Sequence, residues 1–394
     1  MKFYFTFFLI IGVSFMCLSQ KFTMNQGHVL QKNYFSVIHY ENINDKLIIS
    51  VEIDGKKRRF ILDTGAPNAI TKTLSDELNA EIIKKIPVSD QAEKRDSLTV
   101  VSVNKMILGD ILFEGVPALV LDNNSRIIVD CLGVDGFIGS NILRNSIVQF
   151  DSKNKTITLT DNSKNLSLDK RESTALKLDF YQSNPLIQIK VKKDKMVKES
   201  LLLDTGANTF YDLSLNSFNV FQKNGVVNVL SKSTGSDSYG LFGVISDSTK
   251  YRVTIPEISI NKVVSQNVIS ATTIGNQSLI GAKLLDYGIA TVDYKNRKFY
   301  FKSFETINNL EEKLFPINFS SKDGKLVVGV VWDEELAEKL HAGDLVVEVD
   351  GVNYENKSFC DLLLNPSPIK GKDKLTLMIK SETGAIKKVT IYRK

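Results

Sequence analysis

Asp63-Thr64-Gly65-Ala66 and Asp204-Thr205-Gly206-Ala207 are two copies of one tetrapeptide. Each copy follows an apolar run, which is Phe60-Ile61-Leu62 in the first case and Leu201-Leu202-Leu203 in the second. This pattern is typical of a strand that stops at an aspartate, with a glycine that lets the backbone turn. One copy would indicate a turn capped by its aspartate. Two copies indicate paired strands that place two carboxylates face to face.

The similarity between the two parts of the chain continues well beyond the tetrapeptides. Phe137-Ile138-Gly139-Ser140-Asn141-Ile142-Leu143 matches Leu279-Ile280-Gly281-Ala282-Lys283-Leu284-Leu285. Further on, Asp151-Ser152-Lys153-Asn154-Lys155 matches Asp293-Tyr294-Lys295-Asn296-Arg297. The three landmarks recur at the same offset to within one residue, which predicts an internal duplication.

The two halves begin alike but differ after the tetrapeptides. Residues 47–53 and 186–191 are each expected to form the first strand of a hairpin that leads into the aspartate, the first through a turn at Asp54-Gly55. The second half then has a longer excursion, rich in glycine and small polar residues, around Tyr239 and Gly240. We expect this excursion to be either a mobile hairpin that covers a cleft or an ordinary exposed hairpin.

Composition narrows the class of protein. The chain has 394 residues, of which 43% are hydrophobic, so it is long and apolar enough for two or three globular domains. Its net charge of +5 is spread along the sequence without a basic block interleaved with aromatic residues, and we therefore expect no nucleic-acid partner. The motifs of serine hydrolases, NTPases and dinucleotide enzymes are absent from the sequence. The three histidines, His28, His39 and His341, form no ligand pattern with cysteine, so no metal or cofactor is expected.

The N-terminal sequence and the cysteines bear on the compartment. Met1-Lys2 followed by the apolar residues 3–18 predicts a secretory signal peptide, residues 1–19, and hence a secreted or periplasmic protein. An uncleaved membrane anchor is the alternative. Beyond that segment only Cys131 and Cys360 remain. Because they lie far apart in sequence, we expect both to be buried free thiols rather than a disulfide.

The boundaries of the predicted domains follow from composition. Beyond the signal peptide, one lobe is expected at residues 20–160 and a second at 175–304, separated by the polar residues 161–174. A small domain is expected at residues 312–394, with a strand near 325–332 and a helix near 333–341. Residues 20–46 fit a removable pro-segment, a strand of an interdomain sheet, or a disordered segment.

The tetrapeptides and the later Phe137-Ile138-Gly139 and Leu279-Ile280-Gly281 elements resemble the retropepsin-like aspartic proteases, duplicated in one chain as in the pepsins. The resemblance covers roughly residues 33–304 and extends to secreted bacterial proteases. The last domain is similar to their PDZ domains, mainly through residues 342–351, although Leu314-Phe315-Pro316-Ile317 lacks the glycine of a peptide-carboxylate loop. The implied fold is mainly β, with two retropepsin-like β-barrel lobes about a pseudo-two-fold axis, followed by a small α+β PDZ-like domain.

This resemblance implies an aspartic endopeptidase that acts on polypeptides. Asp63 and Asp204 would share one proton and activate a water molecule. The residues expected to support this dyad are Thr64, Gly65, Thr205 and Gly206. One chain supplies both aspartates, so a monomer is expected, with a membrane contact only through the N-terminal segment. A non-catalytic protein that grips an extended polypeptide between the lobes is the alternative.

Overall fold

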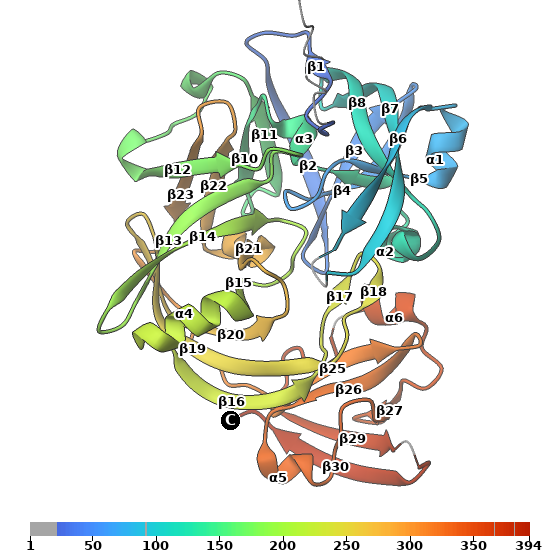
Figure 1. Cartoon of the computed structure of the whole chain (residues 1–394), viewed down its shortest axis with the longest axis vertical. Helices are drawn as coiled ribbons and strands as arrows, with labels where there is room; N and C mark the ends of the chain where they lie inside the picture. The colour runs from blue at the N-terminus through green and yellow to red at the C-terminus, as the bar shows by residue number, and fades with distance from the viewer. Residues whose placement is uncertain (1–21, 91–92, 366, 382) are drawn as a thin grey trace, which may run out of the picture.

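The computed structural model describes residues 22–90, 93–365, 367–381 and 383–394, and the protein is mainly β (Figure 1). The expected signal peptide, residues 1–19, lies outside these described residues. Within them, no helix is both long and apolar enough to cross a membrane.

Two sets of seven strands, one from each half of the chain, have the same arrangement. The first set is β3 Lys46–Ile53, β4 Lys56–Leu62, β5 Ala69–Thr71, β6 Glu81–Ser89, β7 Arg95–Leu108, β8 Ile111–Leu121 and β9 Gly136–Ile138. The second set is β13 Pro185–Lys192, β14 Met196–Asp204, β15 Tyr211–Ser214, β16 Asn228–Gly235, β19 Ser248–Ile260, β20 Val263–Thr273 and β21 Leu279–Gly281.

Strand pairing is the same in the two sets. The aspartate-bearing strand β4 runs parallel to β9, as β14 runs parallel to β21. The short strand β5 pairs with β8 in parallel and with β9 in antiparallel fashion, and β15 pairs with β20 and β21 in the same two ways. The predicted duplication is therefore confirmed at the level of strand register.

A six-stranded antiparallel sheet joins the halves. Its order is β2–β11–β10–β22–β23–β12, and its central pair brings Val148 opposite Val292. The strands are β2 Phe35–Ile43, β10 Ile147–Asp151, β11 Thr156–Thr160, β12 Ser173–Leu178, β22 Gly288–Asp293 and β23 Lys298–Ser303. Of the three readings of residues 20–46, the strand of an interdomain sheet is the one that β2 fits. The short strands β1 His28–Val29 and β24 Ile307–Asn309 pair with β8 and β20.

Alternating burial explains why these segments are strands. In β13, Ile187, Ile189 and Val191 are buried while the residues between them are exposed, which is the period of two of a half-buried strand. Side chains of this kind from both halves and from the six-stranded sheet form one continuous core. A second, separate core of twelve buried side chains includes Val328, Leu375 and Leu377 of the C-terminal region.

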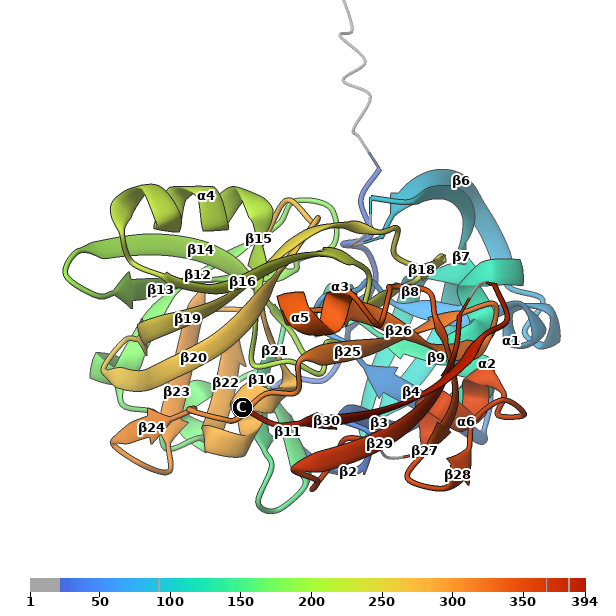
Figure 2. The same cartoon turned by 90° about the horizontal axis from the view of Figure 1, so that it is seen from below.

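The C-terminal unit, residues 315–392, contacts both halves (Figures 1 and 2). Its strands are β25 Ile317–Lys322, β26 Lys325–Val331, β27 Leu345–Val349, β28 Val352–Asn353, β29 Lys374–Lys380 and β30 Ile386–Tyr392. The helix expected near residues 333–341 is shorter, since α5 spans Glu334–Ala337. It ends there because buried Leu340 enters the local core and Gly343 turns the chain at φ 95°. Strand β26 also extends the second half, where Gly235 pairs with Val330.

Helices are few and short. Besides α5 they are α1 Lys72–Glu77, α2 Ile127–Leu132, α3 Ser140–Leu143, α4 Leu215–Asn224 and α6 Phe359–Leu364. The part of the chain that the structure describes also forms four 3₁₀ turns, η1 Asn123–Arg126, η2 Ser163–Asn165, η3 Lys170–Glu172 and η4 Ala282–Tyr287. The polar residues 161–174, expected as a linker, contain η2, η3 and the start of β12.

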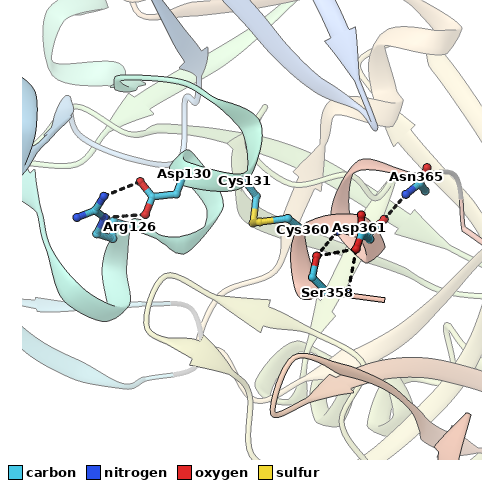
Figure 3. The surroundings of a disulfide bond; sticks show 7 residues. All are labelled: Arg126, Asp130, Cys131, Ser358, Cys360, Asp361 and Asn365. Carbon is cyan, nitrogen blue, oxygen red and sulfur yellow. Dashed lines mark hydrogen bonds and ion pairs between the residues drawn. A yellow bond between two sulfur atoms is a disulfide. The ribbon is translucent and has the colours of Figure 1, made fainter. Parts of the chain in front are cut away.

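The prediction of two free thiols is wrong, because Cys131 and Cys360 form a disulfide (Figure 3). It joins α2 of the first half to α6 of the C-terminal unit, and the two Cα atoms lie 4.9 Å apart. Sequence separation misled the prediction, since docking of α6 against α2 brings together residues 229 positions apart. The bond is consistent with an extracellular compartment, where disulfides persist.

Candidate active site

The two motif aspartates meet at the ends of their strands. Asp63 follows β4 and Asp204 ends β14, and their carboxyl groups share a hydrogen bond. Each carboxylate also accepts a backbone hydrogen bond from the glycine two residues on, Gly65 N at 2.9 Å and Gly206 N at 2.8 Å. A Cβ atom added at either glycine would overlap the opposite carboxyl group. Glycine at these positions is therefore what allows the carboxylates to come this close.

Two threonines lock the strand ends behind the carboxylates. Thr64 Oγ1 donates to the carbonyl oxygen of Leu203 at 2.6 Å and accepts from Thr205 N at 3.0 Å. Thr205 Oγ1 in turn donates to the carbonyl oxygen of Leu62 at 2.9 Å and accepts from Thr64 N at 3.1 Å. Both threonines are buried. The four reciprocal bonds fix the positions of the two aspartates relative to each other.

The titration of Asp63 is strongly perturbed. Burial raises the pKa of Asp63 well above its ordinary range, and the neighbouring Asp204 carboxylate raises it further. The charge of Lys46 acts in the opposite direction. Because two adjacent buried carboxylates cannot both ionise easily, the pair retains one proton at mildly acidic pH.

A second layer of polar groups lies behind the first motif. Ser140 Oγ donates to the carbonyl oxygen of Thr64 at 2.7 Å and lies 3.0 Å from the hydroxyl of Tyr294. Burial raises the pKa of Tyr294, so it remains a neutral phenol. Sequence reasoning missed this support, although the repeat itself carried a signal, since Ala282 takes the place of Ser140 in the second half.

Two further residues that sequence reasoning missed anchor the outer side of each motif. Lys46 Nζ donates to the carbonyl oxygen of Gly206. Asn184 Nδ2 donates to the carbonyl oxygen of Gly65 at 2.9 Å. Lys46 is the first residue of β3 and Asn184 directly precedes β13, and each reaches the motif of the other half. The anchors are thus equivalent in place, but one is charged and the other is neutral.

The excursion of the second half forms a hairpin that reaches the first half. Its strands are β17 Tyr239–Gly240 and β18 Gly243–Val244. Phe242 N donates to Asp90 Oδ2 at 3.1 Å, and Lys94 Nζ donates to the carbonyl oxygen of Val244 at 2.6 Å. Gly240 lies so close to Asp90 that a Cβ atom there would overlap its carboxylate. Both predicted flap residues therefore lie in a hairpin that bridges the halves.

The C-terminal unit supports the same hairpin from another side. The Tyr239 ring packs on the ring of Phe359, with centroids 4.7 Å apart. Phe359 begins α6 and directly precedes the disulfide-bonded Cys360. The position of Tyr239 is therefore tied to the docking of the C-terminal unit.

A buried polar network continues from the base of the hairpin. Burial acts to raise the pKa of Asp237, but its ion pair with Lys250 outweighs burial and lowers the pKa below its ordinary value. Asp237 also accepts a hydrogen bond from Asn318 of β25. Asn318 in turn accepts from Arg252 at 2.8 Å and from the Trp332 indole at 3.1 Å. The network links the hairpin, strand β19 and the C-terminal unit.

A cleft of about 2630 Å³ contains both aspartates. Its walls come from both halves, from the hairpin and from the C-terminal unit, including Tyr239 and Phe359. Another wall residue is Asp212 of β15, and burial raises the pKa of Asp212 to about 6. Among the described residues, no group of three or more histidine, cysteine or acidic side chains is arranged to hold a metal ion. The site thus offers paired carboxylates in a cleft walled by both halves of the chain.

Thr64→Val tests the reciprocal hydrogen bonds between the two threonines and the opposite strands. Valine keeps the shape of the side chain but leaves the Leu203 carbonyl and the Thr205 amide without their buried partner. Because each of the two orphaned groups costs about 1–3 kcal/mol, we expect the free energy of unfolding to fall by about 2–6 kcal/mol. Denaturant unfolding measures the loss, with Thr249→Val on the exposed face of β19 as the control. An unchanged midpoint would contradict the role of this hydroxyl.

Comparison with known proteins supports the first half of this site. Residues 49–142 match a protein family described as aspartyl protease, so the chain contains an aspartyl protease family domain that includes Asp63. Among solved structures, the chain is similar to conglutin gamma, a basic 7S globulin from lupine seeds, with 12% identity and a TM-score of 0.40. That similarity covers 69% of this chain and 95% of the lupine chain. No curated protein matches the sequence.

Proposed function

We propose that this protein is an aspartic endopeptidase whose catalytic residues are Asp63 and Asp204. The observation that carries the proposal is the pair of carboxyl groups that share a hydrogen bond across reciprocal threonine contacts. The match of residues 49–142 to the aspartyl protease family supports the same chemistry. In this proposal the C-terminal unit is the PDZ-like domain that the sequence resembles.

The two carboxyl groups have different roles in the proposed mechanism. In this proposal Asp63, whose pKa burial raises, carries the proton that the pair shares. Asp204 takes a proton from water while the water oxygen attacks the scissile carbonyl carbon, and Asp63 gives its proton to the carbonyl oxygen. Collapse of the resulting diol breaks the carbon–nitrogen bond: one diol hydroxyl returns a proton to Asp63, and the leaving amine takes up the proton held by Asp204. No covalent enzyme intermediate is needed.

The proposed substrate is an extended polypeptide lying in the cleft. The walls of the cleft include the two aspartates, residues of the β17–β18 hairpin, and residues of β25 and α6. A hairpin above a bound chain excludes bulk solvent from the cleft around the reacting bond. Tyr239 and Gly240 are proposed as the parts of this cover nearest the substrate.

A second candidate is a polypeptide-binding protein that does not hydrolyse its ligand. It is favoured by the contacts of the hairpin with Asp90, Lys94 and Phe359, which hold the cover on two sides. Tight peptide binding without cleavage from acidic to neutral pH would support it over the endopeptidase.

The test combines hydrolysis with ligand binding. We expect an unfolded, carboxymethylated protein to be cleaved at mildly acidic pH. A pepstatin-type transition-state inhibitor should raise the melting temperature, because a ligand at 100 times its Kd stabilises the folded state by about 2.7 kcal/mol. Asp204→Asn should lose both effects. If the unmodified protein shows no cleavage and is not stabilised by the inhibitor, the proposal is contradicted.

A further inference from the structure

Lys46 and Asn184 occupy equivalent places in the duplicated structure. Ile48 lies opposite Ile61 in the first half, and Leu186 lies opposite Leu202 in the second. Ile61 and Leu202 each come two residues before a motif aspartate. Lys46 lies two residues before Ile48, and Asn184 lies two residues before Leu186, so the two residues occupy equivalent positions.

The two residues perform one mechanical task. Each side chain crosses the pseudo-two-fold axis and donates to the carbonyl oxygen of the opposite motif glycine, Lys46 to Gly206 and Asn184 to Gly65. The neutral amide of Asn184 performs this task without a charge. The hydrogen bond to the motif carbonyl therefore does not require the positive charge of Lys46.

We propose that Lys46 is a positioning residue that sets the pH range in which the Asp63–Asp204 pair is singly protonated. It does so by holding an ammonium group beside Asp63 through the Gly206 carbonyl. The catalytic meaning of this inference rests on the proposed endopeptidase function, whereas its effect on the titration of the pair does not.

The sign of the effect follows from charge. A nearby cation favours every ionised form of the pair, so Lys46 lowers the apparent pKa of both protonation steps, and burial and Asp204 raise the pKa of Asp63 against it. Among the described residues, Asp212, whose pKa burial raises to about 6, interacts with Asp204, and neutral Tyr294 interacts with Asp63. Both are unaltered by substitutions at Lys46, so a shift seen in such a variant belongs to the ammonium.

Lys46→Asn is the most direct test, because it places in the first half the residue that serves in the second. We expect both limbs of the pH profile of kcat/KM to move to higher pH by roughly one unit. Lys46→Arg, which keeps the charge, should leave both limbs in place. Lys57→Asn, an equal loss of charge at the far end of the same hairpin, is the matched control and should also leave them in place.

Moving the charge across the axis gives a second test. Asn184→Lys adds an ammonium on the other side of the pair, and both limbs should move to lower pH. In the double variant Lys46→Asn with Asn184→Lys, the limbs should return toward those of the unmodified protein, because the carboxyl groups titrate as a pair. Asn184→Lys keeps the inference testable even if Lys46→Asn does not fold.

Carboxyl carbon-13 NMR titration makes the test independent of turnover. The pair's signals, assigned through Asp63→Asn and Asp204→Asn, should titrate at higher pH in Lys46→Asn than in the unmodified protein. Absence of peptide hydrolysis in the unmodified protein would defeat the proposed function but leave this titration shift as evidence for the inference. Unchanged titration in Lys46→Asn, together with unchanged titration in Asn184→Lys, would overturn the inference even in an active protease.

Discussion

Asp63→Asn and Asp204→Asn should each lower kcat/KM for a peptide substrate by about 10²–10⁴-fold. An amide in either position cannot exchange the proton that the mechanism moves between water, carboxyl group and substrate. The hydrogen bond between the two side chains makes each dependent on the other, so the double variant should lose little more than either single one. Peptide cleavage measured across pH 3–7 gives the ratio.

Stability measurements separate loss of chemistry from loss of fold. The pKa of Asp63 is raised in the folded protein, so the folded state holds a proton that the unfolded chain releases above its ordinary value of 3.8. Stability supplied by this group is therefore complete below pH 3.8 and is lost as the pH rises through the folded pKa. Asparagine does not titrate, so Asp63→Asn should melt no lower than the unmodified protein at pH 7.

Asp54→Asn is the matched control for these substitutions. Asp54 lies at the exposed tip of the β3–β4 hairpin with φ 51°, a conformation that asparagine adopts readily. Its activity should equal that of the unmodified protein. Full activity in Asp63→Asn or in Asp204→Asn would remove the basis of the dyad mechanism.

The hairpins and the duplication were predictable from sequence because both depend on local pattern. Asp54 and Gly55 have φ of 51° and 69°, the left-handed geometry that a tight hairpin needs and that these residue types supply. Equal spacing between landmarks indicated that whatever one half forms, the other repeats. Meeting of Asp63 and Asp204 was predictable only through that repetition, since nothing local to either strand specifies its partner.

The anchors of the motifs were not predictable in the same way. Lys46 and Asn184 do not match in sequence, and their equivalence appears only when the strand registers of both halves are known. Each contacts the half to which it does not belong. Contacts across the pseudo-two-fold axis depend on how the halves dock, which strand-period patterns do not specify.

The contacts of the C-terminal unit were also not predictable from local sequence patterns. Its strands follow from local alternation, but its contact with the hairpin through Phe359 and Tyr239 depends on the docking of α6. Cys131 and Cys360 gave no sequence signal of pairing because each lies in a different structural unit. Their pairing shows that the C-terminal unit is covalently fixed to the first half rather than tethered only by the chain.

Replacing both Cys131 and Cys360 with serine should lower the free energy of unfolding by about 2–5 kcal/mol. The bond closes a loop between residues 229 positions apart, so it removes much conformational freedom from the unfolded chain. Denaturant unfolding with and without a thiol reductant measures the effect. Reductant should bring the unmodified protein down to the level of the serine variant and leave that variant unchanged.

Loss of the disulfide should also loosen the hairpin over the cleft. α6 carries both Cys360 and Phe359, and Phe359 supports Tyr239, so weaker docking of α6 removes one of the two sides on which the hairpin is held. The contacts with Asp90 and Lys94 remain. Limited proteolysis by an added protease within residues 237–247 should therefore be faster in the serine variant than in the oxidised protein. Equal cleavage rates, with stability lowered as expected, would mean that the disulfide acts on the fold alone and that the two remaining contacts suffice to hold the hairpin.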